Sequence, residues 1–119
     1  MTFFYLATPY SNYPYGLEEA FRVACLARGA LLRAGVPVFS PIVHSHPVAI
    51  ECGLAPRNHK IWLPSERPIL DCASGLIMLK AESWQDSYGM TKERELFEEA
   101  GKPVLWMTPY VVPRELLKA

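Results

Sequence analysis

One acidic side chain stands on the apolar side of a predicted helix. In SYGMTKERELFEEAGKP, residues 87–103, a rotation of about 100° per residue groups Met90, Leu96 and Phe97, and Glu93 falls among them. A carboxylate turned toward a core costs free energy unless it has partners or a task. Glu93 is therefore a candidate base, nucleophile or cation stabiliser, with a buried ion pair or a hydrogen-bonded core residue as the structural alternative.

Ser87 and Gly89 stand at the start of the same predicted helix. Ser87 is well placed to cap the helix, and Gly89 allows a ligand to approach the backbone closely, so this turn could hold a phosphate or a sugar hydroxyl. A helix N-terminus favours negative charge, so we expect Glu93 to be ionised near neutral pH unless desolvation outweighs that effect. For Ser87 alone, capping without any ligand is the simpler alternative.

Apolar runs alternate with helix-period stretches along the chain. The patterns predict strands at 3–7, 37–42, 75–79 and 103–107, helices at 16–35, 59–72 and 87–103, and a loop at 43–57. This order favours an α/β fold: a single domain over residues 1–119 with a doubly wound, mostly parallel sheet of four to five strands and helices on both faces, Rossmann- or flavodoxin-like. Ligands of such sheets bind beyond the carboxyl ends of the strands, and Glu93 follows the third strand.

The composition favours a small-molecule partner. Twelve basic residues balance twelve acidic ones in 119 residues, so neither a nucleic-acid polymer nor a membrane is expected as partner. The N-terminus has no signal-peptide pattern, and Cys25, Cys52 and Cys72 are odd in number and lack CxxC spacing. We expect a soluble, cytoplasmic protein with reduced thiols.

Four segments together resemble the nucleoside 2-deoxyribosyltransferase-like superfamily, most closely its small bacterial and phage branch. They are YLATPY, FSPIVHSHP, WLPSERPILD, and W-Q-D-S-x-G-x-x-x-E followed by GKPV. The resemblance covers nearly the whole chain. It implies cleavage or transfer at the N-glycosidic bond of a (deoxy)nucleoside or its 5′-monophosphate, through a covalent glycosyl-enzyme, without a cofactor and in a homo-oligomer.

The resemblance also implies roles for individual residues. Glu93 matches the nucleophile, and Tyr5 matches the tyrosine that orients it. Ser87 matches the position that contacts the 5′ end of the sugar, which is serine in the hydrolases of monophosphates; Asp86 beside it keeps a free nucleoside open as the ligand. Glu66 aligns with the aspartate that helps the base to leave.

Further ligand contacts are expected from the loops and from aromatic side chains that could stack on a base. The expected substrate-binding residues are Thr8, Pro9, Tyr10, His44, His46, Trp84, Asp86, Ser87 and Gly89. The chain departs from the family pattern at Ser74, Ser83 and Thr91. These departures leave open an alternative, a catalytically inactive nucleotide-binding module on the same fold.

His44 and His46 allow a third interpretation. Alternate residues in an extended chain share a side, and a His-x-His pair can chelate zinc in a metal-dependent hydrolase. Zinc sites need three or four converging ligands, and no further ligand stands at a telling spacing. We therefore expect no metal. Both histidines are expected to line the pocket mouth and contact the sugar or phosphate, or else to hold the long loop in place.

Overall fold

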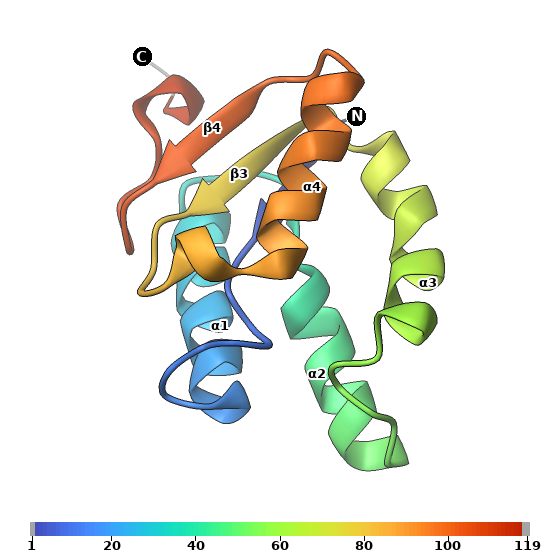
Figure 1. Ribbon diagram of the computed structural model, residues 1–119. Helices are drawn as coiled ribbons and strands as arrows, with labels where there is room; N and C mark the ends of the chain where they lie inside the picture. Colours follow the sequence, from blue (N-terminus) through green and yellow to red (C-terminus); the bar gives the residue numbers. More distant parts are fainter. Residues whose placement is uncertain (1, 118–119) are drawn as a thin grey trace.

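The computed structural model describes residues 2–117 and contains a four-stranded, all-parallel sheet (Figure 1). Its strands are β1 (Phe4–Ala7), β2 (Val38–Phe39), β3 (Gly75–Leu79) and β4 (Val104–Met107), in the order β2-β1-β3-β4. The chain leaves β1 toward one edge to form β2 and then crosses to the other side of β1 to form β3. The strand order therefore reverses between β1 and β3, which is where ligands bind in open α/β sheets.

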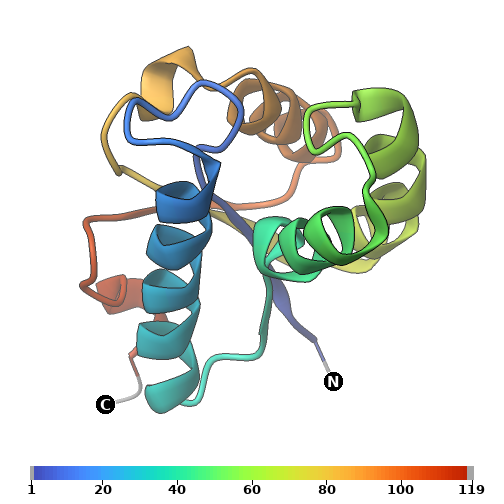
Figure 2. The same ribbon diagram turned by 90° about the horizontal axis from the view of Figure 1, so that it is seen from below.

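Within residues 2–117, four α-helices accompany the strands and confirm the predicted α/β fold. They are α1 (Leu17–Arg33), α2 (Pro41–Cys52), α3 (His59–Cys72) and α4 (Tyr88–Glu99), with short 3-10 helices at Trp84–Asp86 and Arg114–Leu116. Figure 2 shows α1 on one side of the sheet and α3 on the other. The predicted helices at 16–35, 59–72 and 87–103 are confirmed, each within a few residues.

The central strands are buried on both faces, as expected for a parallel sheet. Leu6 of β1 and Ile77 of β3 point into the core beneath α1, whereas Tyr5 of β1 and Met78 of β3 point into the core beneath α3 and α4. Because side chains alternate along a strand, this register fixes Tyr5 on the α3–α4 face. The position of Tyr5 is thus a consequence of the apolar run 3–7.

The loop predicted at 43–57 is wrong, because most of it is helix α2. The Ser40 side chain accepts a hydrogen bond from the Val43 N–H at 3.2 Å, Pro41 occupies the first turn, and Gly53 ends the helix with a φ of 65°. These are ordinary start and stop signals. The helix forms despite Pro47 in its interior. Because it begins at Pro41, the strand predicted at 37–42 is limited to Val38–Phe39.

Gly75 is required by close packing at the start of β3. A Cβ there would lie 2.8 Å from the Phe4 ring and 3.0 Å from both the ring and the carbonyl oxygen of Pro103. Overpacking of this kind costs roughly 1 to 3 kcal/mol. We expect Gly75→Ala to lower the free energy of unfolding by that amount in chemical denaturation. Gly89→Ala, which lies in helix α4 and whose Cβ would meet nothing within 4 Å, should cause no loss.

The C-terminal segment packs on its own chain. Val112 and Leu116 lie against the core cluster beneath α1, so the described part of this tail is neither a free arm nor a long surface helix. Residues 118–119 of this C-terminal segment lie outside the described part of the chain. None of the helices formed by residues 2–117 is long and apolar enough to cross a membrane.

Candidate functional site

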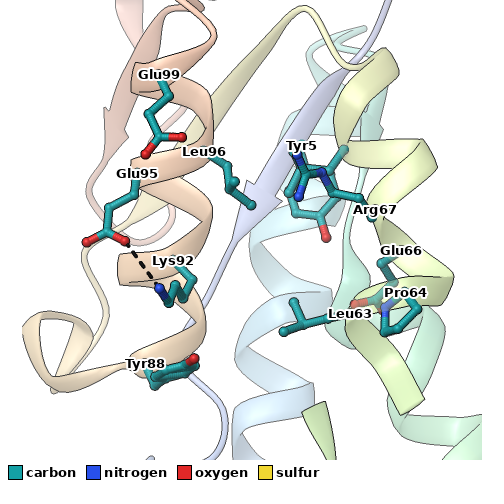
Figure 3. Close-up of a pocket in the computed structure, with 11 residues that line it drawn as sticks. Tyr5, Leu63, Pro64, Glu66, Arg67, Tyr88, Lys92, Glu95, Leu96 and Glu99 are labelled. Carbon is teal, nitrogen blue, oxygen red and sulfur yellow. Dashed lines mark ion pairs between the residues drawn. The ribbon is translucent and has the colours of Figure 1, made fainter. Parts of the chain in front are cut away.

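Two cavities adjoin at the carboxyl ends of the strands. The smaller, about 70 Å³, is walled by the segments that follow β1, β2 and β3 and by α3, and we call it the strand-end cavity. The larger, about 360 Å³, lies between α3 and α4, and we call it the interhelix cavity (Figure 3). Leu63 and Glu66 of α3 line both, so the two cavities meet at these side chains.

The strand-end cavity brings together six of the residues singled out in the sequence. Its wall includes Thr8, Tyr10, Glu66, Ser87, Gly89 and Glu93. They come from the loop after β1, from α3, and from the start of α4, so they are distant in sequence and meet only in the fold. Tyr5, which the sequence also singled out, lines the interhelix cavity, as does Glu66.

Glu93 lies within hydrogen-bonding reach of the Tyr5 hydroxyl. The residue is half-buried, and desolvation of its carboxyl group together with the nearby Glu66 raises its pKa to about 8, although the Tyr5 hydrogen bond opposes the shift. Burial and the two carboxyls also raise the pKa of Tyr5, which therefore keeps its proton and acts as a donor. Desolvation thus outweighs the helix N-terminus at Glu93, which is the exception stated for its expected ionisation, and the raised pKa favours the protonated carboxyl at neutral pH in the free protein.

Glu66 points from α3 toward the same space. In Figure 3 its side chain and that of Tyr5 both face the gap between α3 and α4. The residue is 8% exposed, and burial raises the pKa of its carboxyl to about 7. Two carboxyls in one poorly solvated space hold a single negative charge more easily than two, so they titrate as a pair.

Two buried polar atoms in this region have no partner. Among residues 2–117, the buried side-chain oxygen or nitrogen atoms without a hydrogen bond are Thr8 Oγ1 and Glu66 Oε2. Both residues line the strand-end cavity. Buried polar groups in native proteins are almost always satisfied, so two such atoms in one small cavity indicate a place for a polar ligand.

Ser87 acts as the cap of α4. Its Oγ accepts a hydrogen bond from the Met90 N–H at 3.3 Å, and its carbonyl oxygen accepts one from the Thr91 hydroxyl at 3.0 Å. Capping therefore already occupies the Ser87 hydroxyl as an acceptor, while the hydroxyl proton remains for a ligand. Gly89 faces open space, which leaves room for a ligand at this turn.

The two histidines of the His-x-His motif do not line either cavity. On helix α2, residues two apart point about 200° from each other, so the extended geometry assumed for His44 and His46 is wrong. His44 is exposed and lies against the Phe39 ring. His46 is buried behind the wall of the strand-end cavity, where it contacts Tyr10. Within residues 2–117 no group of three His, Cys, Asp or Glu side chains is placed to hold a metal ion.

Three other expected contacts also lie outside the cavity walls. Trp84 packs against Trp106, with ring centroids 5.3 Å apart, so it serves the core beneath α4. Asp86 is exposed, and its carbonyl oxygen accepts a hydrogen bond from the Asn12 side chain at 3.3 Å. Pro9 is fully buried and shapes the turn after β1.

The structure adds residues that the sequence patterns did not single out. Ser45 of α2 and His59 and Trp62 of α3 line the strand-end cavity, and the His59 ring lies 5.0 Å from that of Tyr88 across the gap between α3 and α4. The Trp62 Nε1–H donates to the Ala55 carbonyl oxygen at 3.0 Å. Only recognition of α2 as a helix would have indicated that Ser45 faces inward.

The raised carboxyl pKa values predict a pH-dependent stability. The folded protein holds protons on Glu93 and Glu66 that the unfolded chain, with the ordinary value of 4.5, releases earlier. The free energy of unfolding should therefore fall by several kcal/mol as pH rises from about 4.5 to about 8. Denaturant titrations across this range should give a flatter profile for Glu93→Gln than for Glu98→Gln, an exposed position on the same helix. Equal slopes for both variants would contradict the assignment.

Comparison with known proteins identifies a family. A family model described as Domain of unknown function (DUF1937) matches residues 2–109. This match covers both cavities and all the carboxyl groups discussed above. No match was found among curated proteins.

Proposed function

This chain belongs to the DUF1937 family, and we propose that it breaks or transfers the N-glycosidic bond of a (deoxy)nucleoside or its 5′-monophosphate. The proposal joins the resemblance to nucleoside 2-deoxyribosyltransferase-like proteins with the arrangement of the site. One observation carries it: Glu93 and Glu66, both with raised pKa values, share one cleft with a tyrosine hydroxyl at Glu93. Carboxyl groups with shifted pKa values that lie together in a cleft are typical of catalytic sites.

In the proposed reaction the two carboxyls have separate tasks. Glu93, as carboxylate, attacks C1′ of the sugar; its oxygen forms a bond to C1′ while the C1′–N bond breaks and its electron pair leaves with the base. Glu66 gives its proton to the departing base. Water, or a second base, then attacks C1′ of the ester and releases Glu93, and Glu66 takes up the proton of the attacking group.

The hydrogen bonding around the pair favours this division. The Tyr5 hydroxyl stabilises negative charge on Glu93, whereas Glu66 Oε2 has no donor within reach. In the free protein the lower pKa of Glu66 places a single negative charge on Glu66. We assign to the reactive form the other arrangement, in which Glu66 holds the proton and Glu93, stabilised by Tyr5, holds the charge. A developing positive charge on the sugar would favour the same arrangement, because the carboxylate lies next to it.

The volumes suggest that the substrate spans both cavities. Sites for small molecules usually measure roughly 300 to 1,000 Å³, so the strand-end cavity of about 70 Å³ is too small for a whole nucleoside. The interhelix cavity, about 360 Å³, supplies the remaining room, and Glu66 stands where the two meet. The bond to be broken would then lie beside Glu66 and Glu93.

The resemblance further leads us to propose a homo-oligomer in which a second copy covers the cleft. Leu63 and Tyr88, at the rim of the interhelix cavity, are 38% and 49% exposed, which leaves apolar surface for such a contact. Light scattering of the purified protein tests this part: a monomer at all concentrations would remove it.

A nucleotide-binding module without catalysis is the second candidate. It is favoured by the pKa of about 8 for Glu93, because a protonated carboxyl cannot attack C1′ at neutral pH. Such a module would bind nucleosides or their monophosphates equally well with and without the Glu93 carboxylate. No observation favours a metal-dependent hydrolase built on His44 and His46.

The experiment that tests the proposal is a panel of ribo- and deoxynucleosides and their 5′-monophosphates, with base release followed by chromatography. The proposal predicts release of base by the wild-type protein and none by Glu93→Gln. Binding of a panel member without any base release, unchanged in Glu93→Gln, would establish the binding module instead. A panel that is neither bound nor cleaved would remove both candidates.

A further inference from the structure

A hydrogen-bonded triad stands behind the wall of the strand-end cavity. His46 of α2 is 3% exposed, and both of its ring nitrogens are engaged: Nδ1 lies 2.6 Å from the Tyr10 hydroxyl and Nε2 lies 2.9 Å from the Glu18 carboxylate of α1. The Phe21 ring stacks on the imidazole with centroids 4.8 Å apart. Tyr10 itself is 7% exposed and lines the cavity, so the triad connects the ligand space to the surface of α1.

The partners determine which nitrogen of His46 carries the proton. An ionised carboxylate can only accept, so Nε2 must donate to Glu18. In a neutral imidazole Nδ1 then has no proton and accepts, which makes the Tyr10 hydroxyl the donor to it. The hydrogen bond to Nδ1 uses the single proton of the Tyr10 hydroxyl. Toward a ligand, the Tyr10 oxygen can therefore only accept a hydrogen bond.

We propose that Glu18 and His46 are positioning residues that hold the Tyr10 hydroxyl as a pure acceptor toward the ligand, so that Tyr10 recognises a hydroxyl of the sugar and not a phosphate oxygen. The statement about the sugar rests on the proposed function, whereas the orientation of the triad does not. An anion at this position would meet lone pairs instead of a proton and would be repelled. A 5′-phosphate, where present, must therefore lie away from Tyr10, at the Ser87 end of the cavity.

The orientation can be tested without any ligand, by measuring the nitrogen resonances of the imidazoles at mildly alkaline pH, with His46→Asn to identify those of His46. The proposal predicts a protonated Nε2 and an unprotonated, hydrogen-bonded Nδ1 in the wild-type protein. Glu18→Leu removes the acceptor and should produce a mixture of tautomers. Glu19→Leu, the neighbouring position on α1 whose carboxylate pairs with Arg22, should leave the spectrum unchanged. A proton on Nδ1 in the wild type would overturn the proposal.

The recognition is tested with pairs of nucleosides that differ by one sugar hydroxyl, compared by kcat/KM. Tyr10→Phe should reduce the preference for the hydroxylated member of one pair by about threefold to tenfold, the usual worth of one hydrogen bond. His46→Leu and Glu18→Leu should reduce the same preference. His46→Asn, which offers an amide oxygen close to the position of Nδ1, should restore part of it. Tyr15→Phe, an exposed tyrosine on the same loop, is the matched control and should change nothing.

The outcomes separate this inference from the proposed function. If the wild-type protein cleaves nucleosides and discriminates between the pairs, but Tyr10→Phe discriminates equally well, the recognition by Tyr10 is wrong and the proposed function stands. If no nucleoside is cleaved, the proposed function and the sugar assignment fail together, and the imidazole spectrum alone decides the orientation of the triad.

Discussion

Glu93→Gln should lose base release by a factor on the order of 10⁴ or more. The amide nearly matches the carboxyl in size and can still accept from the Tyr5 hydroxyl, but it cannot form the ester with C1′. Since the native carboxyl is itself uncharged below its pKa of about 8, the substitution removes no charge from the free protein at lower pH. The variant should therefore fold at least as stably as the wild type, and the loss should appear in kcat with little change in ligand affinity.

The matched control for this prediction is Glu98→Gln on the same helix. Glu98 is exposed and pairs with Arg94 at 3.2 Å, so the same Glu-to-Gln exchange there leaves the cleft untouched. Initial rates of base release measured for the two variants at equal protein concentration provide the comparison. Similar rates for Glu93→Gln and the wild type would show that Glu93 is not the nucleophile.

Glu66→Gln should reduce base release by about 10²- to 10⁴-fold, the usual worth of a general acid. The wild-type protein should show a bell-shaped dependence of kcat/KM on pH. Its acidic limb lies near pH 7 and its alkaline limb near pH 8, because the reactive pair carries one proton and one charge. Removal of the Glu66 proton donor should abolish the alkaline limb. A pH–rate profile measured on both proteins checks the shape.

A substrate that needs no proton supplies the control for Glu66. A nucleoside whose purine is methylated at N7 carries a positive charge on the base, which leaves without protonation. The loss in the rate of base release caused by Glu66→Gln should be much smaller for this substrate, whereas the loss caused by Glu93→Gln should persist. An equal deficit on both substrates would mean that Glu66 has a structural role and does not donate the proton.

Much of the fold could be predicted because several segments have a strong local signal. The runs at 3–7 and 75–79 are continuous and apolar, and the helix-period patterns of α1 and α4 end at glycines, so their types followed from local sequence. Helix α2 could not be recognised from periodicity, because His and Pro residues interrupt its pattern. Its cap signals, Ser40-Pro41 at the start and Gly53 at the end, were present and would have identified it.

The candidate site was predictable in position but not in electrostatics. That the segments after β1 and β3 meet near Glu93 follows from the topology of a parallel sheet. The pKa of Glu93 depends on how closely α3 brings Glu66 to it and excludes water, and such tertiary packing has no signature in the local sequence. The hydrogen bonds that join Tyr10, His46 and Glu18 could not be predicted for the same reason, because the three residues lie on separate elements.

Capture of the glycosyl-enzyme would show directly whether Glu93 is the nucleophile. The protein is mixed with a nucleoside that it cleaves, quenched in acid within the first turnovers, digested and analysed by tandem mass spectrometry. We expect a sugar ester on Glu93, which accumulates with base release and is absent from Glu93→Gln. A sugar attached to another residue, or base release by Glu93→Gln at the wild-type rate, would contradict that expectation.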